Sequence, residues 1–121
     1  MSSFSVTFRN TETIRILDLN GELDAHTASE LEAGIQKCID DDANDIIING
    51  ANLRYISSAG LGVFMAFVEE VREKQGDIKI VALQTNVFDI FDLLGFPHLF
   101  DIHPTEEEAI ELFSNGSRRS A

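Results

Sequence analysis

The stretch Tyr55-Ile56-Ser57-Ser58-Ala59-Gly60-Leu61-Gly62 marks the point where an extended segment ends and a long helix begins. Just before it, the β-branched run at residues 45–48 is typical of a parallel central strand that helices cover on both faces. Just after it, apolar residues recur along one helical face, at Leu61, Phe64, Met65, Val68 and Val71. This strand-to-helix unit predicts an α/β fold and puts two adjacent hydroxyls where the helix starts.

The residues before this unit predict a hairpin and a first helix. Apolar and polar residues alternate over residues 4–9, as in a half-buried strand, and turn residues at 10–13 separate them from an apolar run at 14–19. Residues 21–24 close that second strand. Thr27 and Glu30 have the S/T-x-x-E spacing of a capping box. An apolar stripe follows on the first helix, at Ala28, Leu31, Ile35 and Ile39.

The residues after the unit continue the alternation of strand and helix. We expect the second helix over residues 59–75 with Gly76 as its end, and a covered strand over residues 78–83. A third helix, capped by Thr85, carries an apolar stripe that reaches Leu94 and ends at Gly95. A short strand over residues 99–102 and a helix capped by Thr105 follow.

The element order is therefore β-β-α-β-α-β-α-β-α, which predicts a mainly parallel central sheet with an N-terminal hairpin and helices packed against it. The 121 residues suffice for one hydrophobic core and are too few for two ordinary domains. We expect a single domain over residues 1–113. Residues 114–121 are polar and small, and we expect them to form a disordered tail.

Charge and composition exclude several classes of function. A net charge of −12 argues against a phosphate backbone or an anionic membrane as partner, so neither nucleic-acid binding nor membrane insertion is expected. The single Cys38 cannot form an internal disulfide, no leader opens the chain, and no apolar run approaches the roughly 20 residues of a membrane helix. These features predict a cytoplasmic protein. Residues 81–117 contain no Lys or Arg, as expected for a solvated face or for a surface that steers a basic partner.

Motifs of catalysis and cofactor binding are missing. Ile56 stands two residues before Ser58, so the Gly-x-Ser-x-Gly pattern of a serine hydrolase is not met, and Met65 occupies the third glycine position of a dinucleotide fingerprint. The three histidines have no ligand spacing with Cys38 or with one another: His26, His98 and His103. The sequence predicts no enzyme, no metal site and no cofactor.

The two serines have the properties of a regulatory site. A serine at a helix start is commonly a cap, which is the role expected of Ser57. A phosphate on Ser58 would lie near the positive end of the helix dipole, so the fold would tolerate it, whereas a docked partner would not. The small residues after it, Ala59, Gly60 and Gly62, either leave room for a partner or serve tight packing of the helix on the sheet. Asp24, at the end of a neighbouring strand, is either a simple turn residue or a neighbour of Ser58.

These residues resemble a known family. The segments Gly21-Glu22-Leu23-Asp24, Thr27-Ala28 and Ile56-Ser57-Ser58-Ala59-Gly60-Leu61-Gly62 are similar to those of the STAS domain of bacterial anti-sigma factor antagonists, and the similarity spans nearly the whole chain. The resemblance implies a phosphoacceptor serine. In that family an anti-sigma factor, itself a serine kinase, phosphorylates the antagonist. The unphosphorylated antagonist binds the kinase and frees the sigma factor, and a metal-dependent serine phosphatase restores the antagonist.

Carried over by position, the resemblance makes Ser58 the phosphoacceptor and Asp24 an acidic residue that helps kinase contact. Ser57 departs from the family, in which Asp is common at that position, so both serines stay candidates for modification. Ala59 stands where a second Ser or Thr is common. The alternative function is that of an accessory STAS subunit that regulates a transporter or binds a nucleotide. We expect a monomer.

Overall fold

The sheet begins with the predicted hairpin. In the computed structural model, which describes residues 4–115, β1 (Ser5–Thr11) and β2 (Ile14–Leu23) pair antiparallel. The turn between them places Glu12 at a positive φ of 54°. Residues 116–121 of the predicted tail lie outside the described residues, and Ser114 belongs to the last helix.

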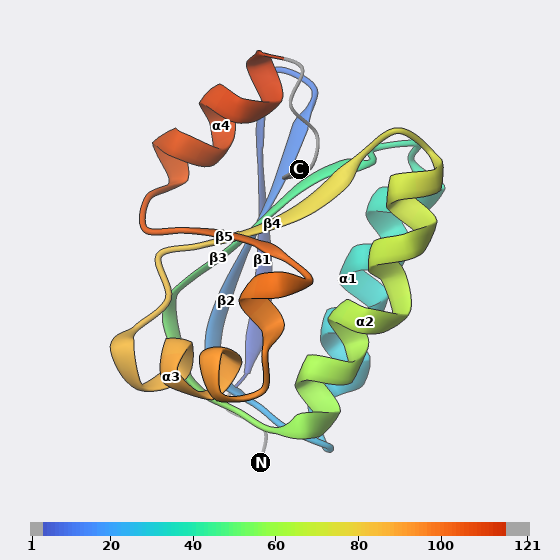
Figure 1. Cartoon of the computed structure of the whole chain (residues 1–121). Helices are drawn as coiled ribbons and strands as arrows, with labels where there is room; N and C mark the ends of the chain where they lie inside the picture. Colours follow the sequence, from blue (N-terminus) through green and yellow to red (C-terminus); the bar gives the residue numbers. More distant parts are fainter. Residues whose placement is uncertain (1–3, 116–121) are drawn as a thin grey trace.

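The remaining strands add to β2 in parallel, in the order in which they occur in the chain. They are β3 (Asp45–Ile56), β4 (Asp77–Val81) and β5 (Asp101–His103), so the sheet has the order β1-β2-β3-β4-β5. The helices are α1 (Ala28–Asp40), α2 (Ser58–Glu73), α3 (Thr85–Leu93), the 3₁₀ turn η1 (Phe96–His98) and α4 (Glu106–Ser114). The fold is the predicted single α/β domain with an N-terminal hairpin (Figure 1).

Helices cover both faces of the sheet. The side chains of α1, α2 and α3 pack over one face, where the larger core includes Leu31, Phe64 and Phe91. Within residues 4–115, α4 is the one helix that packs over the other face, through Ala109 and Phe113 (Figure 1). The isoleucines of β3 alternate between these two cores, which explains why the run at residues 46–48 is apolar throughout.

The central strand is longer than predicted. The β-branched run predicts a strand over residues 45–48, yet β3 continues to Ile56. Its second half pairs with β2 alone, because the register with β4 ends at Asn49. Irregularities in the β2–β3 register, at residues 18–20 and 21–22, accompany this extension. The result is that β2 and β3 end side by side, with Leu23 opposite Ile56.

The two predicted capping boxes have different outcomes. Thr105 caps α4, because its hydroxyl accepts from the Glu108 N–H at 3.3 Å. Thr27 precedes α1 as predicted, but in the described structure its hydroxyl caps no N–H of the helix and instead donates to the Glu22 carbonyl at 2.9 Å. The S/T-x-x-E spacing therefore identifies both helix starts but only one of the two capping bonds.

The region after α2 differs from the prediction in four details. The left-handed residue that ends the helix is Gln75, with φ 71°, while Gly76 is required for packing, since a Cβ there would lie 2.0 Å from the Asn44 carbonyl oxygen. Thr85 is the first residue of α3 rather than its cap, and Leu94 is exposed. The last strand begins at Asp101, not at residue 99.

A buried cluster of charged residues lies on the face of the sheet that α4 covers. Lys79, on β4, has no exposed surface, and its ammonium lies 2.6 Å from Asp101 and 3.3 Å from Asp77. It also lies 4.8 Å from the centre of the Phe113 ring. Asp77 accepts a further bond from the Arg72 guanidinium at 2.8 Å. The cluster links β4, β5, α2 and α4 through groups that the sequence pattern does not connect.

A second ionic contact joins the two ends of the fold. Arg9, on β1, binds Asp18 of β2 at 2.6 Å and Glu106 of α4 at 2.6 Å. Glu106 also accepts from the side-chain amide of Asn49 at 2.9 Å. Hydrogen bonding to Arg9 lowers the pKa of the Glu106 carboxyl below its usual range. The first strand and the last helix are therefore tied directly to each other.

Candidate functional site

The site lies where β2 and β3 end and α2 begins. The backbone N–H of Ser57 donates to the Leu23 carbonyl at 2.9 Å, which continues the strand pairing to the last residue before the helix. Ser57 has extended backbone angles, φ −104° and ψ 173°, and its carbonyl accepts from the Leu61 N–H at 3.1 Å. Ser57 is thus the N-cap residue by position, as predicted.

The side chains of the two serines differ in exposure. The Ser57 hydroxyl oxygen is buried and has no hydrogen-bond partner among the described residues, so Ser57 makes no side-chain capping bond. Ser58 is the first residue of α2 and is exposed to solvent. The first turn of α2 contains no acidic side chain, so its free N–H groups face no fixed negative charge from the helix itself.

Asp24 lies on the same rim of the sheet. Asp24 directly follows Leu23, and Leu23 lies opposite Ile56 in the register of β2 and β3. Asp24 therefore lies at the end of the sheet from which α2 starts. Its carboxylate accepts from the backbone N–H groups of His26 at 2.9 Å and Thr27 at 3.2 Å. Asp24 therefore stabilises its own turn, as a turn residue is expected to do, and its contact with Ser58 stays a prediction.

The small residues of the first turns of α2 divide into two groups. Gly60 is buried, and a Cβ at this position would lie 2.6 Å from Cγ of Leu23. Ala59 and Gly62 are exposed, and within the described structure a Cβ on Gly62 would meet no atom within 4 Å. Gly60 therefore serves close packing of the helix on the sheet, whereas Ala59 and Gly62 leave the surface beside Ser58 open.

This division predicts opposite effects of two alanine substitutions. Gly60→Ala should lower the free energy of unfolding by about 1–3 kcal/mol, because the added methyl overpacks against a fully buried leucine. Gly62→Ala should raise it by about 0.5–1 kcal/mol, because alanine is the better helix former and the methyl has free space. Urea denaturation of both variants measures this. Equal effects of the two changes would contradict the assignment.

Two large apolar residues that are near the serines in the sequence are exposed. Tyr55, three residues before Ser58, is 47% exposed, and Met65, two turns into α2, is 44% exposed. The sequence pattern placed Met65 on the buried stripe of the helix, whereas the structure turns it outward beside Gly62. The period of the helix alone does not distinguish an apolar residue at the edge of the stripe from one within it.

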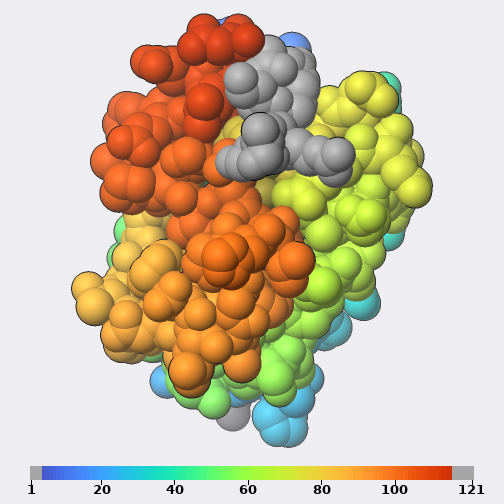
Figure 2. All heavy atoms as spheres, viewed as in Figure 1, coloured from blue at the N-terminus to red at the C-terminus, as the bar shows by residue number. Residues whose placement is uncertain are grey.

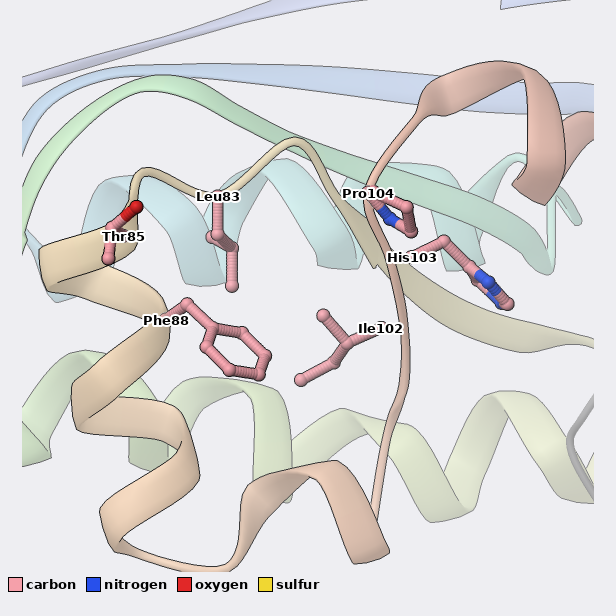
Figure 3. Close-up of a pocket in the computed structure, with 6 residues that line it drawn as sticks. All are labelled: Leu83, Thr85, Phe88, Ile102, His103 and Pro104. Carbon is pink, nitrogen blue, oxygen red and sulfur yellow. The ribbon is translucent and has the colours of Figure 1, made fainter.

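A separate hollow of about 400 Å³ lies beyond the ends of β4 and β5. The side chains of Leu83, Phe88 and Ile102 point toward one another across it (Figure 3). Thr85, His103 and Pro104 complete the lining, which contains no Lys or Arg. The hollow is therefore mostly apolar and offers no Lys or Arg side chain to a phosphate group.

The described residues were also searched for metal sites and membrane spans. No group of three or more His, Cys, Asp and Glu side chains within them is arranged to hold a metal ion. None of the helices in this part of the chain combines the length and apolarity that a membrane crossing requires.

Comparison with known proteins identifies the family. A family model of the STAS domain matches residues 5–109. The chain belongs to the STAS domain family. The match begins at the first residue of β1 and ends within α4, so the STAS domain accounts for every strand of the sheet.

Relatives of this STAS domain are named as regulators. BtrV of Bordetella bronchiseptica, provisionally named an anti-sigma factor antagonist, is 27% identical over 114 residues, covering 94% of this chain and 98% of BtrV. The anti-sigma-B factor antagonist of Staphylococcus epidermidis is 28% identical over 103 residues, covering 81% of this chain and 95% of that protein.

A solved relative shares the fold. The anti-sigma factor antagonist SpoIIAA in its unphosphorylated form superimposes with a TM-score of 0.78 at 24% identity, covering 92% of this chain and 97% of SpoIIAA. The phosphorylated form of Bacillus SpoIIAA superimposes with a TM-score of 0.67 at 26% identity, covering 91% of this chain and 98% of that one. The STAS fold, with its N-terminal hairpin, is thus common to this chain and to a protein known in a phosphorylated form.

Proposed function

We propose that this protein is an anti-sigma factor antagonist controlled by phosphorylation of Ser58. The unphosphorylated form binds an anti-sigma factor kinase and thereby releases the sigma factor, and phosphorylation abolishes that binding. A serine phosphatase returns the protein to its binding form. The observation that carries the proposal is the contrast between the two serines: the Ser58 side chain is exposed at the start of α2, whereas the Ser57 hydroxyl is buried.

The electrostatics of the helix start support a phosphate at this position. A phosphoserine carries about −1.5 to −2 charges, and the N-terminus of a helix provides free N–H groups and a positive dipole end. With no carboxylate in the first turn, Ser58 can accept this charge without unfolding α2. A partner docked on Ala59 and Gly62 would instead have to desolvate the phosphate, which is unfavourable. One covalent change therefore alters binding and leaves the fold intact.

The relatives support the class of function. Proteins that align with most of this chain are named anti-sigma factor antagonists, and SpoIIAA occurs in a phosphorylated form. Such a protein acts by binding, without catalysis or a cofactor of its own, and in the cytoplasm, where sigma factors meet RNA polymerase. The alternative of nucleotide binding gains no support from the apolar hollow beside α3, because its lining residues include no Lys or Arg.

The test is phosphorylation by the anti-sigma factor kinase encoded in the same genome. The purified protein, incubated with that kinase and ATP, should gain one phosphate by intact mass, and peptide mapping should locate it on Ser58. Ser57→Ala should still be modified, whereas Ser58→Ala should not be modified and should bind the kinase whether or not ATP is present. A phosphate on Ser57, or no phosphate on the parent protein, would overturn the proposal.

A further inference from the structure

The turn that follows α3 exposes three leucines. Leu93 is 83% exposed, Leu94 is 53% exposed and Leu99 is 45% exposed. Together they are called the leucine turn below. Single exposed apolar residues are common on protein surfaces, but three large ones within seven residues of chain are a concentration of exposed apolar side chains that solvent alone does not favour.

The backbone that carries the leucine turn is firmly held. Gly95 adopts the left-handed conformation, with φ 77°, and reverses the chain after α3. The Phe96 ring then stacks on Phe100 at 5.4 Å and meets Phe91 edge-on at 5.6 Å. The guanidinium of Arg72 donates to the Leu99 carbonyl at 3.0 Å, which fastens the end of the turn to α2. The exposed leucines are thus carried by a backbone that packed aromatic rings and a hydrogen bond hold in place.

The leucine turn lies against the helix that begins with Ser58. The α3 residue Phe91 contacts Phe64 of α2, with ring centres 6.2 Å apart. Figure 1 shows the end of α3 beside the first turns of α2, and in Figure 2 the orange surface of the turn borders the green surface of α2. Met65, also on α2, is a further exposed apolar residue. Ser58 and the leucine turn therefore both adjoin α2, Ser58 as its first residue and the turn through Arg72 near the other end of the helix.

The charged residues near the leucine turn indicate which kind of partner fits it. The exposed charged residues of α3 are Asp89 and Asp92, and residues 81–115 contain no Lys or Arg. A second copy of the chain would bring the same carboxylates against them, and the net charge of −12 opposes an anionic membrane surface. The complementary occupant is a protein with an apolar groove that basic residues surround.

We propose that the leucine turn is a second contact for the anti-sigma factor kinase, separate from Ser58 and unaffected in its chemistry by phosphorylation. This inference rests on the function proposed above. The leucines enter an apolar groove of the kinase, while basic residues around that groove meet Asp89 and Asp92. The contact at Ser58 switches the complex on and off, and the leucine turn supplies affinity and selects the correct kinase among related ones.

The test measures kinase binding by isothermal titration calorimetry with the double variant Leu93→Ser, Leu99→Ser. Both side chains are exposed, so its urea midpoint should equal that of the parent protein. We expect binding of the unphosphorylated variant to weaken at least tenfold. The matched control is Phe8→Ser, which removes an apolar side chain that is 41% exposed on β1 and should leave binding unchanged.

The outcomes separate this inference from the function on which it rests. If the leucine variant binds as tightly as the parent while Ser58→Asp loses binding, the inference is wrong and the proposed function stands. If the parent sediments as a dimer and the variant as a monomer, a second copy covers the leucines and the inference is also wrong. If Ser58→Asp binds like the parent, the proposed function fails, and this inference fails with it.

Discussion

Ser58→Asp is expected to weaken binding of the anti-sigma factor kinase by about 1–3 kcal/mol, or roughly 5- to 150-fold in Kd. The carboxylate places a permanent negative charge at the exposed start of α2. A partner that docks there must remove the water that solvates this charge, which is unfavourable. The fold should not lose stability, because a negative charge near a helix N-terminus is favourable by about 0.3–1 kcal/mol. Calorimetric titration and urea denaturation measure the two effects separately.

A control variant distinguishes a local effect from a change in net charge. Thr13, exposed in the β1–β2 turn, lies at the opposite end of β2 from Leu23 and the serines. Thr13→Asp adds the same charge and should bind the kinase as the parent does. Equal losses in both variants would point to long-range repulsion, and an unchanged affinity of Ser58→Asp would remove Ser58 from the interface.

Lys79→Met is expected to have the largest effect on stability, a loss of about 3–5 kcal/mol of unfolding free energy. The substitution keeps most of the volume but leaves the buried Asp101 carboxylate without the ammonium 2.6 Å away. Asp77 keeps the bond from Arg72, and the Asp101 carboxylate keeps His103 Nε2 at 2.9 Å. Since small domains are stable by only about 5–15 kcal/mol, the variant should denature at a clearly lower urea concentration.

The double variant Lys79→Met, Asp101→Leu checks the cause. It removes both members of the close pair, so it should be more stable than Lys79→Met alone. Lys74→Met provides the matched control, because Lys74 is an exposed lysine in a 3.8 Å pair with Glu70 and should cost less than about 1 kcal/mol. A loss for Lys79→Met no greater than that for Lys74→Met would show that the buried cluster does not stabilise the fold.

Most of the fold could be predicted, because the spacing of apolar residues along the sequence indicates which side chains are buried. The isoleucines at 46–48 identified the central strand, and the capped amphipathic segments identified the helices. What the pattern missed depends on contacts distant in sequence. Lys79 looks like a surface residue in an apolar run, and its main partner is 22 residues away, at Asp101. Likewise, β3 extends past Gly50 because β2 is there to pair with it.

The candidate site was predictable in position but not in detail. The sequence located the serines at a helix start and Asp24 on the same rim, because parallel strands end at a common edge. It could not say which serine is exposed, since this depends on the direction in which the chain leaves β3. The packing role of Gly60 was equally open, because only the structure brings Leu23 within 2.6 Å of its missing Cβ.

The order of the strands in the sheet has a consequence for how the protein is made. Because every strand pairs with its neighbour in the chain, each new unit can dock on a surface that the ribosome has already released. Growth then proceeds from the hairpin edge outward without waiting for a distant partner. The exception is α4, which packs on the face of the sheet opposite to α1, α2 and α3. Its first residue, Glu106, binds Arg9 of β1. Synthesis must reach α4 before that face is covered, so the nascent chain exposes the apolar side chains of that face to aggregation until α4 has been released.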